Sequence, residues 1–132
     1  MIKNFLTIQI EYLVNDKDII PFKQLCYTIN HKIELESKCI FNQFSCIKLD
    51  KTIWKITCIQ GFSSTDGYFY HIYNVKEEYK KLNTLGEMIF KRFYGLKRHL
   101  KYIKEKYTEF EFLEKSELDE SEVSNYSYFD II

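Results

Sequence analysis

The sequence contains little that would interrupt or cross-link its structure. Its 132 residues include one proline and four glycines, which leaves little room for long loops. The four cysteines form no C-x-x-C pair and their spacing fits no zinc motif, so the common structural zinc sites are excluded. No apolar run approaches the roughly 18 residues of a membrane span, and no signal peptide is evident. We therefore expect a cytoplasmic protein with reduced, mostly buried thiols.

Motifs for catalysis are also missing. The sequence has no H-E-x-x-H, no Gly-rich phosphate loop and no nucleophile elbow. The best single candidate for acid–base chemistry is His71, with Asp66 and Glu78 as candidate partners; the alternative is a buried histidine whose ring nitrogens are satisfied among tyrosines. Cys46 and Cys58 are more typical of small buried hydrophobes than of nucleophiles. We expect no enzymatic activity, no metal and no cofactor.

Apolar and aromatic residues, by contrast, are abundant. They make up 45% and 17% of the chain, which excludes disorder for most of it and predicts one domain with a substantial core. Residues 5–14 alternate between apolar and polar, as in a half-buried strand. Helical spacing follows, with Pro21 in the first turn and an end between Asn30 and Ile33. Residues 40–49, 52–62 and 68–75 predict a three-stranded antiparallel meander.

The longest pattern runs from residue 76 to about residue 110. Apolar residues recur there at steps of three and four, which predicts either one long helix or two helices that meet near Asn83. The stripe consists of Leu82, Leu85, Ile89, Phe93, Leu96, Leu100, Ile103, Tyr107 and Phe110. The expected fold is an α+β two-layer sandwich: an antiparallel sheet of about four strands with helices on one face, in a single domain at residues 1–112.

Charge divides the chain into two unequal parts, although the formal net charge is zero. Residues 109–132 hold eight acidic residues and one lysine, whereas residues 1–108 hold eighteen basic and eleven acidic residues. Residues 113–132 are therefore predicted to be an acidic C-terminal tail with an aromatic docking end. We expect the segment from Glu114 to Glu122 to pack near Lys97, Arg98 and Lys101 through ion pairs.

The acidic tail and the aromatic segment at residues 68–75 suggest a protein-binding function. Acidic groups beside aromatic anchors suit a basic protein surface, such as that of a toxin or nuclease. The first hypothesis is therefore a non-catalytic inhibitor, immunity protein or antitoxin that neutralises or regulates a protein partner. Its predicted contact residues are Glu114, Glu117, Asp119, Glu120 and Glu122 in the tail, with Tyr68, Tyr70 and Tyr73 on the aromatic strand.

Three alternatives remain open. A basic helix face could follow a phosphate backbone, which would make the protein a nucleic-acid-binding domain, although the balanced overall charge argues against this. The residues of that face are Lys91, Lys97, Arg98, Lys101 and Lys104. The same basic, amphipathic helix could lie on an anionic membrane surface, but its long apolar stripe fits a sheet better. A small enzyme acting through His71 is the last alternative.

Overall fold

A computed structural model describes residues 6–107 and 109–115 of the chain. The elements are β1 (Leu6–Asn15), a 3-10 turn (Asp16–Asp18), α1 (Ile19–Ile33), β2 (Cys39–Lys48), β3 (Ile53–Phe62), α2 (Thr65–Asn74), α3 (Lys76–Leu85), β4 (Gly86–Leu96), α4 (Lys97–Lys106) and β5 (Glu111–Lys115). None of the helices in these residues is long and apolar enough to cross a lipid bilayer.

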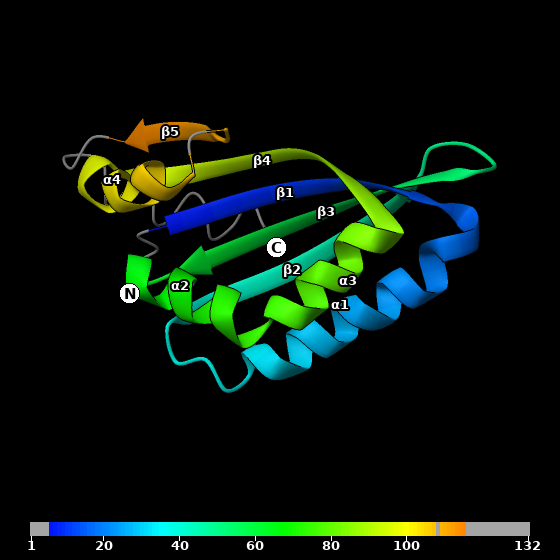
Figure 1. Ribbon diagram of the computed structural model, residues 1–132, viewed down its shortest axis with the longest axis horizontal. Helices are drawn as coiled ribbons and strands as arrows, with labels where there is room; N and C mark the ends of the chain where they lie inside the picture. Colours follow the sequence, from blue (N-terminus) through cyan, green and yellow to red (C-terminus); the bar gives the residue numbers. More distant parts are fainter. Residues whose placement is uncertain (1–5, 108, 116–132) are drawn as a thin grey trace.

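The strands form one sheet in the order β2-β3-β1-β4-β5 (Figure 1). The first four strands pair antiparallel with their neighbours, whereas β5 pairs parallel with β4. Strand β1 therefore lies at the centre of the sheet, although it is the first element of the chain. The paired residues of β1 and β3 run without a register shift from Leu6 opposite Phe62 to Asn15 opposite Ile53.

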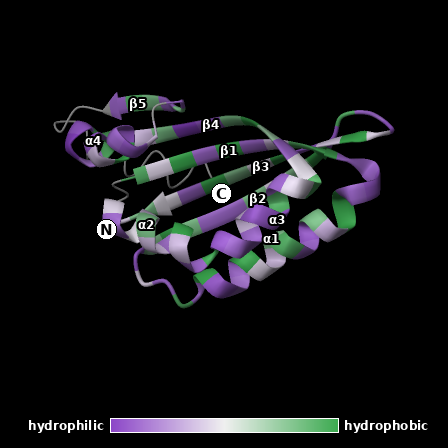
Figure 2. Cartoon of the chain, in the orientation of Figure 1, coloured by the Kyte–Doolittle hydropathy of each residue, from purple (hydrophilic) through white to green (hydrophobic). Residues whose placement is uncertain are grey.

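One face of this sheet forms the hydrophobic core. The core-facing side chains of β1, at alternate positions from Leu6 to Val14, are at most 2% exposed, and the positions between them are only partly buried. Buried residues of all four helices belong to the same core cluster, so the helices cover one face of the sheet. Figure 2 shows α1 alternating between hydrophobic and hydrophilic stretches, as expected for a helix with one buried side.

The structure confirms an α+β fold, and the predicted first strand, first helix and the strands at residues 40–49 and 52–62 all form. The prediction of a four-stranded antiparallel sheet is wrong, because the sheet has five strands and is mixed. Residues 68–75 were expected to be a strand, but they lie mostly in α2. The side chain of Ser64 begins this helix by accepting a hydrogen bond from the Gly67 backbone N–H at 3.1 Å.

The prediction of a long helix at residues 76–110 is also wrong, because strand β4 separates α3 from α4. The helical spacing has a specific origin. Opposite Glu11 and Tyr12, β4 contains one extra residue, Ile89, so its apolar residues fall out of simple alternation. At the start of the strand, a Cβ on Gly86 would lie 3.0 Å from Phe22, so this position suits a glycine.

The predicted boundary between domain and tail, at residue 112, remains a prediction. Strand β5 continues to Lys115, so the sheet includes three residues beyond that boundary. The rest of the predicted tail lies outside the described residues.

Candidate functional site

A small cavity lies between the core-facing side of the sheet and the helices. Its volume is about 200 Å³, and side chains from β1, α2, α3, β4 and the segment after α4 line it. The wall includes Tyr12, Tyr68, Tyr79, Tyr107, Met88, Phe110 and Lys91, together with the exposed residues Lys76, Lys80 and Asn83. Because an apolar cavity of about 150 Å³ holds a benzene molecule, this space can admit one substituted ring.

Lys91 provides the only ammonium group on the core-facing side of β4, where it pairs with Ile10 of β1. Its Nζ donates a hydrogen bond to the Tyr68 hydroxyl at 3.2 Å. The same nitrogen lies 5.0 Å from the ring centre of Phe110 and 5.3 Å from that of Phe93. Among the described residues, no carboxylate lies within ion-pair distance of this nitrogen. The closest groups around the cation are therefore aromatic rings and one phenol, and Glu109 acts on it only from beyond ion-pair distance.

Burial changes the acidity of Lys91. Desolvation lowers the pKa of its ammonium from 10.5 to about 8, although the charges of Cys58 and Glu109 act in the opposite direction. A lysine with such a pKa exchanges its proton near neutral pH, which an ordinary lysine does not. Lys91 can therefore act as a cation, a hydrogen-bond donor or a proton acceptor inside the cavity.

Two phenols of the cavity stay protonated. Burial raises the pKa of Tyr12 and that of Tyr68 above the ordinary value. The Tyr12 hydroxyl is buried and has no hydrogen-bond partner among the described residues. Since buried polar groups are nearly always paired, this hydroxyl is a donor that a molecule in the cavity could satisfy.

A buried polar network borders the cavity behind Tyr79. The His71 side chain is completely buried, and its Nδ1 lies 3.1 Å from both oxygens of the Glu36 carboxylate. Its Nε2 lies 2.9 Å from the Tyr79 hydroxyl, to which the Gln60 amide also donates at 2.5 Å. The Asn74 amide donates to the second oxygen of Glu36 at 2.8 Å. The network thus links a carboxylate, an imidazole and a phenol.

His71 has the satisfied ring nitrogens that the sequence suggested, but its partners differ from those expected. Asp66 lies on the exposed side of α2, and Glu78 forms an ion pair with Lys32 at 3.0 Å. The actual carboxylate, Glu36, comes from the turn after α1. Its sequence surroundings, Leu-Glu-Ser, carry no motif that would have identified it.

A second hollow, of about 400 Å³, lies on the other side of this network. It is lined by residues that follow α1 and by the start of α2, and Glu36 forms part of its wall. The residues that line it are Leu35, Glu36, Ser37, Lys38, Asp66, Gly67 and Tyr70. The Glu36 side chain is only 2% exposed, so this hollow approaches the carboxylate without opening it fully to water.

The cysteines are free, and none of them is a good nucleophile. Cys26 and Cys58 are buried, and Cys39 and Cys46 are half-buried. Burial raises the pKa of Cys26 and that of Cys39 to about 12, and that of Cys58 well above its ordinary value. Because the thiolate is the reactive form, these thiols are inert at neutral pH.

The predicted partner-binding residues do not form one surface in the described structure. On α2, Tyr68 is buried, whereas Tyr70 is 52% exposed and Tyr73 is 80% exposed. Glu114 lies on β5, an edge strand of the sheet. The remaining members of the set, Glu117, Asp119, Glu120 and Glu122, lie outside the described residues.

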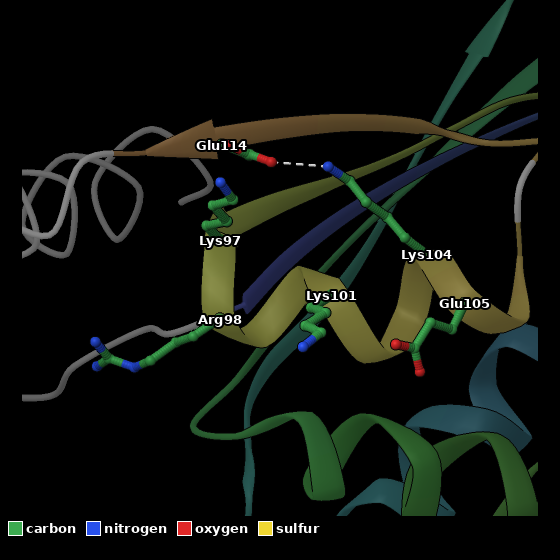
Figure 3. Close-up of a pocket in the computed structure, with 6 residues that line it drawn as sticks. All are labelled: Lys97, Arg98, Lys101, Lys104, Glu105 and Glu114. Carbon is green, nitrogen blue, oxygen red and sulfur yellow. Dashed lines mark hydrogen bonds and ion pairs between the residues drawn. The ribbon is translucent and has the colours of Figure 1, made fainter.

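The predicted basic face is divided between two elements. Lys97, Arg98, Lys101 and Lys104 lie on α4, whereas Lys91 lies on β4, is half-buried and lines the cavity. The α4 residues border a hollow of about 600 Å³ together with Glu105 and Glu114. Figure 3 shows Lys104 reaching Glu114 at 2.8 Å, while Lys101 and Glu105 point away from β5. This hollow is larger than the cavity, but exposed charged side chains line it and no buried polar group converges on it.

The ion pair between Lys104 and Glu114 bears on the expectation that the acidic segment packs against α4. Glu114 makes this contact with Lys104 and also lies in the wall of the hollow that Lys97, Arg98 and Lys101 border. The hydrogen bond from Lys104 lowers the pKa of the Glu114 carboxyl. The other acidic residues of the segment, from Glu117 to Glu122, lie outside the described residues, so for them the expectation remains a prediction.

Comparison with known proteins identifies the fold. No family model matches the sequence, and no curated protein matches it. The solved structure of MupZ from Pseudomonas fluorescens matches 89% of this chain and 90% of its own, with a TM-score of 0.73 and 18% identity. A candidate antibiotic biosynthesis monooxygenase from Caulobacter crescentus CB15 matches 69% of this chain and 88% of its own, with a TM-score of 0.54 and 12% identity.

A third solved structure, a conserved protein from Methanosarcina mazei Go1, matches 69% of this chain and 93% of its own. Its TM-score is 0.54 and its identity is 18%. The fold resembles the ferredoxin-like folds of the monooxygenase type. At these identities the similarity establishes the fold and leaves the chemistry to the residues of the site.

These findings correct the function predicted from the sequence. The prediction of an inhibitor, immunity protein or antitoxin is wrong: the fold neighbours are MupZ and a candidate biosynthetic monooxygenase. The aromatic strand that was to form the contact surface is a helix with Tyr68 in the core. The nucleic-acid alternative required one continuous basic helix, which strand β4 replaces in part.

Proposed function

We propose that this chain is an enzyme that binds a small organic acid, phenol or enol in the cavity and stabilises its oxyanion through Lys91. The observation that carries the proposal is the half-buried ammonium group of Lys91, which lines the cavity and has no carboxylate within ion-pair distance among the described residues. A buried charge without a counter-ion is unfavourable, and an anionic ligand would supply the missing charge. The fold neighbours support an enzymatic role, because one of them is a candidate antibiotic biosynthesis monooxygenase.

The shape of the cavity sets the class of ligand. Its volume of about 200 Å³ and its aromatic wall suit one ring or a short apolar chain. The phenols of Tyr12 and Tyr68 remain protonated, so they can donate hydrogen bonds to a ligand oxygen beside the ammonium group. The ligand therefore combines an apolar body with one acidic oxygen.

The reaction step that this arrangement favours is loss of a proton from the ligand. As the proton leaves, negative charge develops on the oxygen, and donors fixed around it stabilise that charge strongly in a site that excludes water. Such an oxygen would lie beside the Lys91 cation and the neutral Tyr68 hydroxyl, whose nitrogen and oxygen atoms are 3.2 Å apart. Removal of one fixed donor of this kind typically slows a reaction by roughly 10²–10³-fold.

Binding of 4-nitrophenol tests the proposal, because only its phenolate absorbs visible light. At a pH where the free compound is protonated, the wild-type protein should bind it as the phenolate and produce visible absorption. Lys91→Met should weaken binding by roughly tenfold to a hundredfold, since a hydrogen bond to a charged group is lost. Lys101→Met removes an exposed lysine of α4 and should bind like the wild type. Equal binding by wild type and Lys91→Met would contradict the proposal, as would no binding at all.

A further inference from the structure

The buried network spans the distance between the cavity and the second hollow. Tyr79 is part of the cavity wall, and Glu36 is part of the wall of the second hollow. His71 lies between them with no exposed surface, in contact with the carboxylate at 3.1 Å and with the phenol at 2.9 Å. Three groups that can carry protons therefore form a continuous chain through the core.

The hydrogen bonds of Gln60 determine the direction of this chain. The Gln60 amide nitrogen carries only donors, and it lies 2.5 Å from the Tyr79 oxygen and 3.2 Å from His71 Nε2. With the Gln60 amide in this orientation, His71 Nε2 is an acceptor, and the Tyr79 O–H can donate to it. The His71 proton is then on Nδ1 and is donated to Glu36. A hydroxyl, an imidazole and a carboxylate follow one another in this order in serine hydrolases as well.

We propose that Tyr79, His71 and Glu36 form a proton relay that accepts the acidic proton of the ligand bound in the cavity. This inference rests on the proposed function. The ligand O–H bond breaks and its proton binds the Tyr79 oxygen, while the original Tyr79 proton moves to His71 Nε2. The ligand remains as an oxyanion beside Lys91, Tyr79 is again a neutral phenol, and His71 becomes an imidazolium beside the Glu36 carboxylate. Two protons move, one along each hydrogen bond, so that the net result is transfer of one proton from the ligand to His71, and no oxidant or reductant is needed.

The surroundings of His71 suit this role. Its charged and titratable neighbours are Glu36 from the turn after α1 and Tyr79 from α3, and the Phe62 ring of β3 packs at 5.2 Å. The Asn74 amide holds the second Glu36 oxygen, so the carboxylate is oriented before a proton arrives.

Nitrogen-15 NMR of the histidine rings tests the relay, because the two neutral tautomers and the imidazolium give different nitrogen shifts. His71→Asn identifies the signals of His71 among those of the three histidines. In the free protein, His71 should be neutral with its proton on Nδ1. With 4-nitrophenol bound as the phenolate, at a pH where the free probe is protonated, His71 should become an imidazolium and no proton should be released to the buffer.

Two variants separate a relay from a structural network. Glu36→Gln keeps the size of the side chain but removes the charge that stabilises the imidazolium, so His71 should stay neutral and about one proton should be released per probe bound. Glu34→Gln removes an exposed carboxylate two residues away and should behave like the wild type.

Three outcomes would overturn the relay: a free His71 that is already an imidazolium, a bound complex in which His71 is unchanged, or Glu36→Gln behaving like the wild type. If Glu36→Gln does not fold, the wild-type spectra with and without the probe decide alone. Failure of the probe to bind contradicts the proposed function and the relay together, whereas binding without a change at His71 contradicts the relay only.

Discussion

Replacement of Lys91 by methionine is expected to stabilise the free protein at neutral pH. Folding lowers the pKa of this ammonium from 10.5 to about 8, which corresponds to an unfavourable free energy of about 3 kcal/mol for the charged form. Methionine fills a similar volume without the charge, but it leaves the Tyr68 hydroxyl without its donor, which costs about 1 kcal/mol. The net gain should therefore be about 2 kcal/mol.

The effect has a defined dependence on pH. Because the pKa of Lys91 is lower in the folded than in the unfolded state, the unfolded state binds more protons between about pH 8 and 10.5. The penalty is therefore complete below about pH 8 and disappears as the pH rises through this window. The stability advantage of Lys91→Met should shrink over the same range.

Urea unfolding at about pH 7 and about pH 10 measures this difference. The buried thiol of Cys26 also responds to high pH, but it is common to both proteins and cancels in the comparison. Because Lys91 lowers the pKa of Cys58, both proteins should carry Cys58→Ala. Lys101→Met, at an exposed position of α4, should change stability by less than about 0.5 kcal/mol at either pH. A Lys91→Met protein that is less stable than the wild type at pH 7, or an advantage that does not vary with pH, would refute the reasoning.

Three further changes test the fold. Phe93→Ala should lower the free energy of unfolding by about 3–5 kcal/mol, since the ring is fully buried. Phe90→Ala, on the outer face of β4, should lower it by about 1 kcal/mol. Equal losses in chemical denaturation would contradict the assignment of these two residues to opposite faces of β4. Ser64→Ala should cost about 1 kcal/mol and speed amide hydrogen exchange in the first turn of α2, and unchanged exchange there would contradict the cap. Lys104 lowers the pKa of Glu114, so the ion pair stabilises the fold above the unfolded pKa of Glu114, and this stabilisation is lost as the pH falls. Glu114→Gln should therefore reduce stability slightly at low salt, with no difference at high salt or in acid. An effect that does not depend on salt would contradict the ion pair.

Local patterns in the sequence were sufficient to predict the elements in the first half of the fold. In β1 every second residue from Leu6 to Val14 is apolar, and in β3 the buried positions from Ile56 to Phe62 follow the same period. Periodicity could not assign residues 68–75, where aromatic side chains occupy both possible faces. The serine cap at Ser64 was the better signal there, because it begins a helix at the following residue.

The second half of the fold depends on a bulge that leaves no local signature. An extra residue at Ile89 shifts the alternation of β4, so the apolar residues of this strand do not follow a period of two. The same shift decides the direction of Lys91, which pairs with Ile10 on the core-facing side and does not join the basic residues of α4. The sequence could not show that Glu36 contacts His71, since 35 residues separate them and only the tertiary fold brings the turn after α1 against α2.

The features that lower stability are concentrated around one cavity. The ammonium group of Lys91 is buried without a carboxylate among the described residues, and the hydroxyl of Tyr12 is buried without a partner. Each could be replaced by an apolar side chain of similar volume at a gain in stability. Elsewhere in the described core, Glu36, Glu78 and His71 have hydrogen-bond partners, whereas Gln60 Oε1, in the network behind Tyr79, has none. Two unfavourable groups that line the same 200 Å³ are more consistent with a site for a ligand than with imperfect packing.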